Sequence, residues 1–241
     1  MPEHAHIVTS FEDELRSLDN RIAEMGGLAE RLVDQSFEAL DKRDTRLAEL
    51  AIASDLAIDR HEREVESQAI AMIGRRQPMA LDLRHITTAI KVAGDLERVG
   101  DLAKNIAKRA LAVANEPRPK QLMGGIGHMT EIAQRQLKDV LDAYAMRDAE
   151  KAEAVWRNDG LIDALYNSLF RELLTYMMED PRNIGLCTHL LFAAKNLERI
   201  GDHATNIAET TYFLVNGAQL AEDRPKGDTT SSTAITDRTS S

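Results

Sequence analysis

The sequence contains little of what builds a disulfide-linked or β-rich protein. Its 241 residues include one cysteine, Cys187, so no disulfide can form within the chain, and this usage fits a reducing compartment. Aromatic residues make up only 4 % of the chain and prolines number six, so strand-favouring aromatics and helix-breaking prolines are both scarce. Ala, Leu, Glu and Arg are abundant instead, which favours an all-α protein.

Segments that would place the chain in a membrane or export it are also missing. No apolar run approaches the roughly 20 residues that a membrane-spanning helix needs. The first residues, Met1-Pro2-Glu3-His4, have neither the basic region nor the apolar core of a secretory signal. We therefore expect a cytoplasmic protein with no direct membrane insertion.

The excess of negative charge excludes a further class. A formal net charge of −10 argues against nucleic acid as a direct partner and favours multivalent cations or basic protein surfaces.

One thirteen-residue segment occurs twice. The copies cover residues 96–108 and 197–209, and nine of their thirteen positions are identical at a constant offset of 101. A repeat with this spacing indicates two similar domains that each carry the same motif.

The apolar residues recur with a helical period in both halves of the chain. Polar turns at 41–44 and 75–78, and a proline-containing segment at 115–119, divide this pattern. The predicted helices cover residues 10–43, 45–74, 79–114, 121–145, 149–178 and 183–216. Short turns make successive helices antiparallel. We therefore predict two tandem, similar three-helix bundles built from six long antiparallel helices.

The predicted domain boundaries follow from these helices. Residues 10–116 form the first bundle and residues 117–221 the second. We expect residues 1–9 to be a flexible N-terminus. Residues 222–241 are rich in Asp, Thr and Ser without an apolar period, so we expect a disordered tail.

Each copy of the motif places two acids four residues apart on a predicted helix: Glu97 and Asp101 in the first, Glu198 and Asp202 in the second. The first pair falls on the apolar side of its helix, where like charges repel. The adjacent Gly100 destabilises a helix by about a further 1 kcal/mol relative to alanine. Because both predicted helices carry this destabilising arrangement, we expect that another interaction or a function compensates for it.

The preceding helix of each bundle carries a matching pair of acids. Residues equidistant from the turn of an antiparallel hairpin lie abreast. The turn near Pro78 therefore brings Asp59 opposite Glu97 and Asp55 opposite Asp101. The turn at Asp180-Pro181 repeats this pairing in the second bundle. The predicted site residues are Asp55, Asp59, Glu97, Asp101, Asp159, Asp163, Glu198 and Asp202.

Four carboxylates across one helix pair repel unless a cation or protons neutralise them. Sites made only of oxygen ligands suit hard cations, so we predict divalent or ferric ions, with iron, manganese, magnesium and zinc as candidates. The alternative is neutralisation by ordinary ion pairs with Arg60, Arg63, Arg98 and Arg199. The residue pattern leaves both open.

The doubled motif Leu-Glu-Arg-(Val/Ile)-Gly-Asp-x-Ala-x-Asn-Ile-Ala, with the segment Pro78–Arg84 before its first copy, resembles the PhoU family of phosphate-specific transport accessory proteins. The resemblance covers residues 10–217. It implies two three-helix bundles and a cytoplasmic regulator that represses the phosphate-starvation regulon when phosphate is plentiful. It also implies contact with the ATPase subunit of the phosphate ABC transporter and with a sensor histidine kinase. In the family the paired acidic motifs bind multinuclear iron or other metal clusters, which implies that role for the eight acids named above.

Two functions compete on these observations. One is a non-enzymatic adaptor that self-associates as a homodimer, the commonest oligomer. The other is a metal-dependent phosphohydrolase that uses the carboxylate clusters. Catalytic metals need open positions and a nearby base or electrophile, whereas this sequence offers no candidate nucleophile and no glycine-rich phosphate loop. We therefore expect the adaptor.

Overall fold

The computed structural model describes residues 3–116 and 120–220. Its regular elements within these ranges are all helical, which confirms the all-α class. The first half contains α1 (Glu3–Lys42), α2 (Thr45–Arg76) and α3 (Leu81–Ala112). The second half contains α4 (Lys120–Met146), α5 (Ala149–Arg157), α6 (Gly160–Glu179), the short 3-10 helix η1 (Pro181–Asn183) and α7 (Ile184–Asn216).

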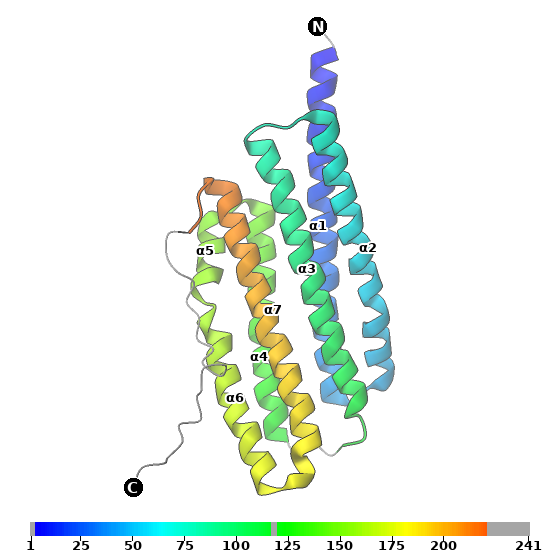
Figure 1. The fold of residues 1–241 in the computed structure, drawn as a ribbon, viewed down its shortest axis with the longest axis vertical. Helices are drawn as coiled ribbons and strands as arrows, with labels where there is room; N and C mark the ends of the chain where they lie inside the picture. Colours follow the sequence, from blue (N-terminus) through cyan, green and yellow to red (C-terminus); the bar gives the residue numbers. More distant parts are fainter. Residues whose placement is uncertain (1–2, 117–119, 221–241) are drawn as a thin grey trace, which may run out of the picture.

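Two three-helix bundles lie side by side with their long axes roughly parallel (Figure 1). In the first, α3 packs against α1 and α2; in the second, α7 packs against α4, α5 and α6. The two helices that carry the repeated motif also pack against each other, and α1 contacts α4. The buried apolar residues of both bundles belong to one continuous core. The motif helices α3 and α7 therefore lie at the centre of the molecule.

The same turn chemistry closes the first hairpin of each bundle. Asp44 and Asp148 are the N-caps of α2 and α5, and their side chains accept hydrogen bonds from the backbone N–H of Leu47 and Lys151, both at 2.9 Å. Such a cap satisfies a backbone donor that the helix itself leaves unpaired. Because these turns are short, consecutive helices run antiparallel, as predicted.

The predicted fifth helix, 149–178, is wrong in one respect, because the chain breaks it into α5 and α6. Asn158 lies at the break, where its side chain donates to the Ala154 carbonyl at 2.9 Å. Gln136 of α4 donates to the Asn158 carbonyl at 3.3 Å. These side chains pair with carbonyls near the end of the first segment, and Gly160, a poor helix former, follows.

Three other boundaries differ from the prediction or fall beyond it. Helix α1 begins at Glu3 rather than at residue 10, and no glycine or proline separates these positions. The remaining residues of the predicted flexible N-terminus, 1 and 2, lie outside the described residues. So does the predicted disordered tail, 222–241. Among the described helices, none is long and apolar enough to span a bilayer.

Candidate functional site

Two of the four acids of the first hairpin contact the same lysine. We call Asp55, Asp59, Glu97 and Asp101 the first cluster. Asp55 of α2 is 2 % exposed, and Lys104 of α3 donates to its Oδ2 at 2.5 Å. The same ammonium donates to Asp101 Oδ1, also at 2.5 Å. Lys104 therefore joins the two acids that the hairpin register places opposite each other.

The first cluster is electrostatically coupled. Burial raises the pKa of Asp55; Lys104 lowers it in part, and the charges of Asp59 and Asp101 add to the rise. Burial, followed by the charge of Asp101 and with a further contribution from Asp59, raises the pKa of Glu97. Burial disfavours the charged form of Lys104, but its hydrogen bonds to Asp101 and Asp55 outweigh this and raise its pKa. The four acids thus act on one another as one group.

Arginines lie only at the edge of this cluster. Arg98 Nε lies 3.5 Å from Glu97 Oε2, and Arg63 Nη2 lies 4.0 Å from Asp59 Oδ2. Both arginine side chains are largely exposed, so solvent screens these pairs. The ion pairs predicted as an alternative to metal therefore form in part, whereas the half-buried cation of the cluster is Lys104. Sequence reasoning missed Lys104, although its spacing of three from Asp101 was a signal.

The second hairpin repeats the acids with different neighbours. We call Asp159, Asp163, Glu198 and Asp202 the second cluster; the first three are buried. Thr205 donates from Oγ1 to Asp159 Oδ1 at 2.7 Å. Lys195 donates to Glu198 Oε1 at 2.8 Å.

Burial raises the pKa of Glu198; Lys195 offsets the rise in part, and the charges of Asp202 and Asp163 add to it. Glu198 is therefore coupled electrostatically to Asp163 and Asp202, as Glu97 is to Asp59 and Asp101.

The glycine of each motif keeps the two acid-bearing helices close. A Cβ atom at Gly100 would lie 2.9 Å from Ile58 Cδ1 and 3.1 Å from Asp55 Oδ1. At Gly201 it would lie 3.0 Å from both Gln136 Oε1 and Ile162 Cγ2. These distances are shorter than ordinary van der Waals contacts, so any larger residue would push the helices or their side chains apart.

The chemistry of the donors fits a hard cation. They are carboxylate oxygens on two adjacent helices, and two of those oxygens, Asp55 Oδ1 and Glu198 Oε2, are buried without a hydrogen-bond partner. In the part of the chain that the structure describes, no three Asp, Glu, His or Cys side chains are arranged to hold a metal ion. A lysine ammonium contacts each cluster instead.

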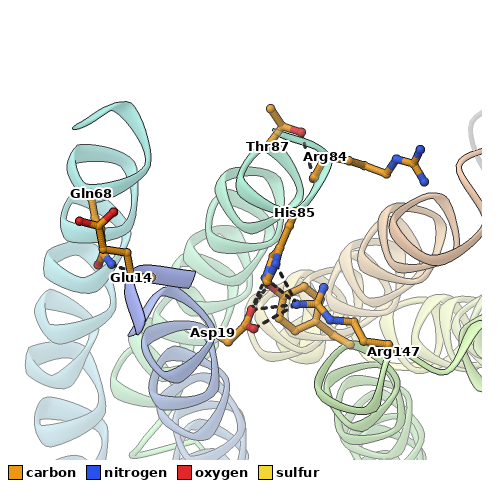
Figure 2. Close-up of polar contacts among 8 residues, drawn as sticks. Glu14, Asp19, Gln68, Arg84, His85, Thr87 and Arg147 are labelled. Carbon is orange, nitrogen blue, oxygen red and sulfur yellow. Dashed lines mark hydrogen bonds and ion pairs between the residues drawn. The ribbon is translucent and has the colours of Figure 1, made fainter. Parts of the chain in front are cut away.

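A separate polar cluster joins the two bundles (Figure 2). Asp19 of α1 lies 2.8 Å from His85 Nε2 of α3, and it accepts hydrogen bonds at 3.0 Å from both Tyr144 and Arg147 of the second bundle. Burial disfavours the charged form of Asp19, but the interactions with His85, Arg147 and Tyr144 together lower its pKa. We call these four residues the junction cluster; sequence reasoning missed it.

A second contact between the bundles lies further along α3. His203 Nδ1 of α7 lies 2.8 Å from Asp95 Oδ1, and Asn206 donates to the same oxygen at 3.4 Å. Polar side chains therefore fix the register of α3 against α7, in addition to apolar packing.

Comparison with known proteins finds the same family that the doubled motif indicates. The PhoU domain matches residues 22–110 and 126–211. A phosphate-specific transport system accessory protein PhoU homolog of Rhizobium meliloti is 58 % identical over 228 residues, which are 95 % of this chain and 96 % of that protein. The homolog of Caulobacter vibrioides is 49 % identical over 223 residues, which are 92 % and 97 % of the two chains.

Solved structures agree. The crystal structure of PhoU from Pseudomonas aeruginosa superposes with a TM-score of 0.84 at 38 % identity, covering 86 % of this chain and all of that one. The PhoU structure from Streptococcus pneumoniae has a TM-score of 0.80 at 28 % identity, covering 87 % and 99 % of the two chains. Because the PhoU domain matches most of the chain, the relatives are similar over nearly their full length and the fold is shared, the chain belongs to the PhoU family.

Proposed function

We propose that this protein is an accessory regulator of phosphate-specific transport. The observation that carries the proposal is the near full-length identity with relatives named as accessory proteins of that system. These relatives carry the name of an accessory protein rather than of an enzyme, which supports a non-enzymatic role.

In its finer form the proposal is a cytoplasmic negative regulator of phosphate uptake and of the phosphate-starvation regulon. It bridges the ATPase subunit of the phosphate ABC transporter and a sensor histidine kinase. This form rests on the family resemblance. The negative net charge of −10 favours basic surfaces on both partners, so the contacts should weaken as salt is raised.

The molecule offers two separate ends on which such partners could act. Met79 and Leu81 are exposed where α2 leads into α3, and Met178 and Ile184 are exposed where α6 leads into α7. These turns lie at opposite ends of the long axis (Figure 1). Two exposed apolar ends on one molecule suit an adaptor, and the long helix faces suit self-association as a homodimer.

The acid clusters are proposed to bind divalent or ferric ions. The eight carboxylates would hold the ions. Burial and mutual repulsion disfavour the charged form of these acids, and the positive charge of a bound ion would offset both effects. A cation in the first cluster would bind α2 and α3 together. A cation in the second cluster would do the same for α6 and α7, with Asp159 contributing from the position just before α6.

A reporter assay tests the regulatory proposal. A phosphate-starvation promoter drives the reporter in a strain without this protein, grown at high phosphate. The full-length protein and a 1–221 truncation should both silence it, because the truncation keeps every described helix. A reporter that stays on with well-expressed full-length protein contradicts the proposal. Turnover of phosphate esters by pure, metal-loaded protein, above that of a carboxylate-to-alanine control, would favour the phosphohydrolase instead.

A further inference from the structure

The two clusters have the same acids but different built-in cations. We propose that Lys104 competes with metal at the first cluster, so that metal fills the second cluster first. The inference rests on the proposed metal binding and adds to it an order of occupancy, which is set by one side chain.

Lys104 lies where a bound cation would lie. Its ammonium is 2.5 Å from an oxygen of Asp55 and 2.5 Å from an oxygen of Asp101. Oxygen ligands approach Mg²⁺ or Ca²⁺ at about 2.0–2.6 Å, so an ion between these two acids would take the space of the ammonium. The two cations also repel each other. Binding at the first cluster therefore requires Lys104 to leave.

Leaving is unfavourable for Lys104. Its side chain is 21 % exposed and it donates to acids on two helices at once. If a metal displaces it, the ammonium loses both charge-assisted hydrogen bonds, which are stronger than neutral ones. Lys104 therefore offsets part of the negative charge of the first cluster without metal.

The second cluster has a neutral residue at the same position of the motif. Thr205 replaces Lys104 there, and its buried hydroxyl donates to Asp159. The lysine of the second cluster, Lys195, contacts Glu198 and stands where the first repeat has Gly94. Its ammonium also lies 4.9 Å from the centre of the Tyr166 ring. At 36 % exposure its side chain is closer to solvent than that of Lys104, so solvent screens its ion pair with Glu198 more strongly than it screens those of Lys104.

The second cluster also has buried oxygen atoms for which the protein supplies no hydrogen bond. Glu198 Oε2 is one, and it corresponds to the unpartnered Asp55 Oδ1 of the first cluster. The second cluster adds another, Gln136 Oε1, which lies beside Gly201 of the motif. Aligning the Arg43-Asp44 and Arg147-Asp148 turns shows that Leu32 occupies the position of Gln136 in the first repeat. An amide oxygen is a suitable ligand for a hard cation, and the first repeat lacks it.

Titration of the full-length, chelator-stripped protein with Mn²⁺ tests the inference. Free and bound Mn²⁺ are measured by electron paramagnetic resonance. The wild type should show two classes of sites. Asp202→Asn should weaken the tight class, and Asp101→Asn should weaken the loose class.

The decisive variant is Lys104→Thr, which gives the first cluster the residue type that Thr205 supplies at the same motif position in the second cluster. The dissociation constant of the loose class should fall at least tenfold, with the tight class unchanged; Lys104→Met should act in the same direction. Lys108→Met, on an exposed lysine of the same helix, removes the same charge and should change neither class tenfold.

An unchanged loose class in both Lys104 variants, with helix content intact by circular dichroism, would overturn the inference while leaving metal binding in place. So would assignment of the tight class to Asp101. No Mn²⁺ binding by the wild type and every variant is a different result, because it removes the proposed metal centre itself.

Discussion

At the scale of single residues, Glu198 carries the clearest burial penalty in the second cluster. Its pKa is raised because burial disfavours the carboxylate. The folded state therefore holds the Glu198 proton more tightly than the unfolded state does. The resulting destabilisation is complete above the folded pKa and disappears as pH falls below the unfolded value of about 4.3.

Replacing this carboxylate should stabilise the metal-free protein. Glu198→Gln removes the charge at nearly constant shape, so its urea midpoint at pH 7.5 should exceed that of the wild type. The difference should shrink as pH is lowered toward 4.5. Chelator-treated protein must be used, because a bound cation would favour the carboxylate. A variant less stable than the wild type at pH 7.5 would contradict the assignment.

Gly100 and Gly94 form a matched pair on α3. A Cβ at Gly100 would meet Ile58 and Asp55, whereas nothing lies within 4 Å of a Cβ at Gly94. Alanine favours a helix over glycine by about 1 kcal/mol, and overpacking destabilises by about 1–3 kcal/mol. Urea unfolding should therefore show Gly94→Ala stabilised by up to about 1 kcal/mol and Gly100→Ala destabilised. Equal stabilisation by both would mean that α2 and α3 are not in close contact at Gly100.

At the scale of helices, the repeated Arg-Asp turns depend on their caps. Asp44→Ala and Asp148→Ala each remove an acceptor for a backbone N–H at the start of a helix. Each should lower the free energy of unfolding by about 1 kcal/mol. Asp41→Ala, on an exposed residue just before the first turn, is the control and should change it little. Equal effects at Asp41 and Asp44 would argue against capping.

Most of this helical arrangement could be predicted from the sequence. The apolar period and the turn residues place the helices, and the hairpin register then brings Asp55 and Asp101 to one lysine. The break at Asn158 escaped prediction because the apolar period continues through it. It depends on Gln136, which comes from another helix. Lys104 was missed because register concerns backbone positions, whereas the reach of a long side chain depends on its rotamer.

At the scale of the whole molecule, the junction cluster ties the bundles together. Its residues lie on α1, α3, α4 and the turn after α4, and no repeat or periodic pattern predicts which surfaces of two bundles meet. Asp19 has a lowered pKa, so its stabilising contribution is fully present above the unfolded value of about 3.9. It is lost as pH falls through the folded pKa.

Removing this carboxylate should loosen the junction. Asp19→Asn leaves Arg147 and Tyr144 with a weaker acceptor, so the free energy of unfolding at pH 7 should fall by about 1 kcal/mol, a value discounted for partial exposure. The deficit should vanish once the pH is below the folded pKa. Asp41→Asn, on an exposed residue of the same helix, is the control. A deficit that persists unchanged in acid would contradict the ion-pair account.

The central claim is that the doubled acidic motif is a pair of cation sites. The most direct measurement is elemental analysis of purified protein after loading with saturating manganese and removal of free ions. Wild-type protein should retain manganese. A variant with Asp59, Glu97 and Asp101 changed to alanine should retain about half as much, because the second cluster is intact and binds independently. Equal metal content in the variant and the wild type would contradict the assignment.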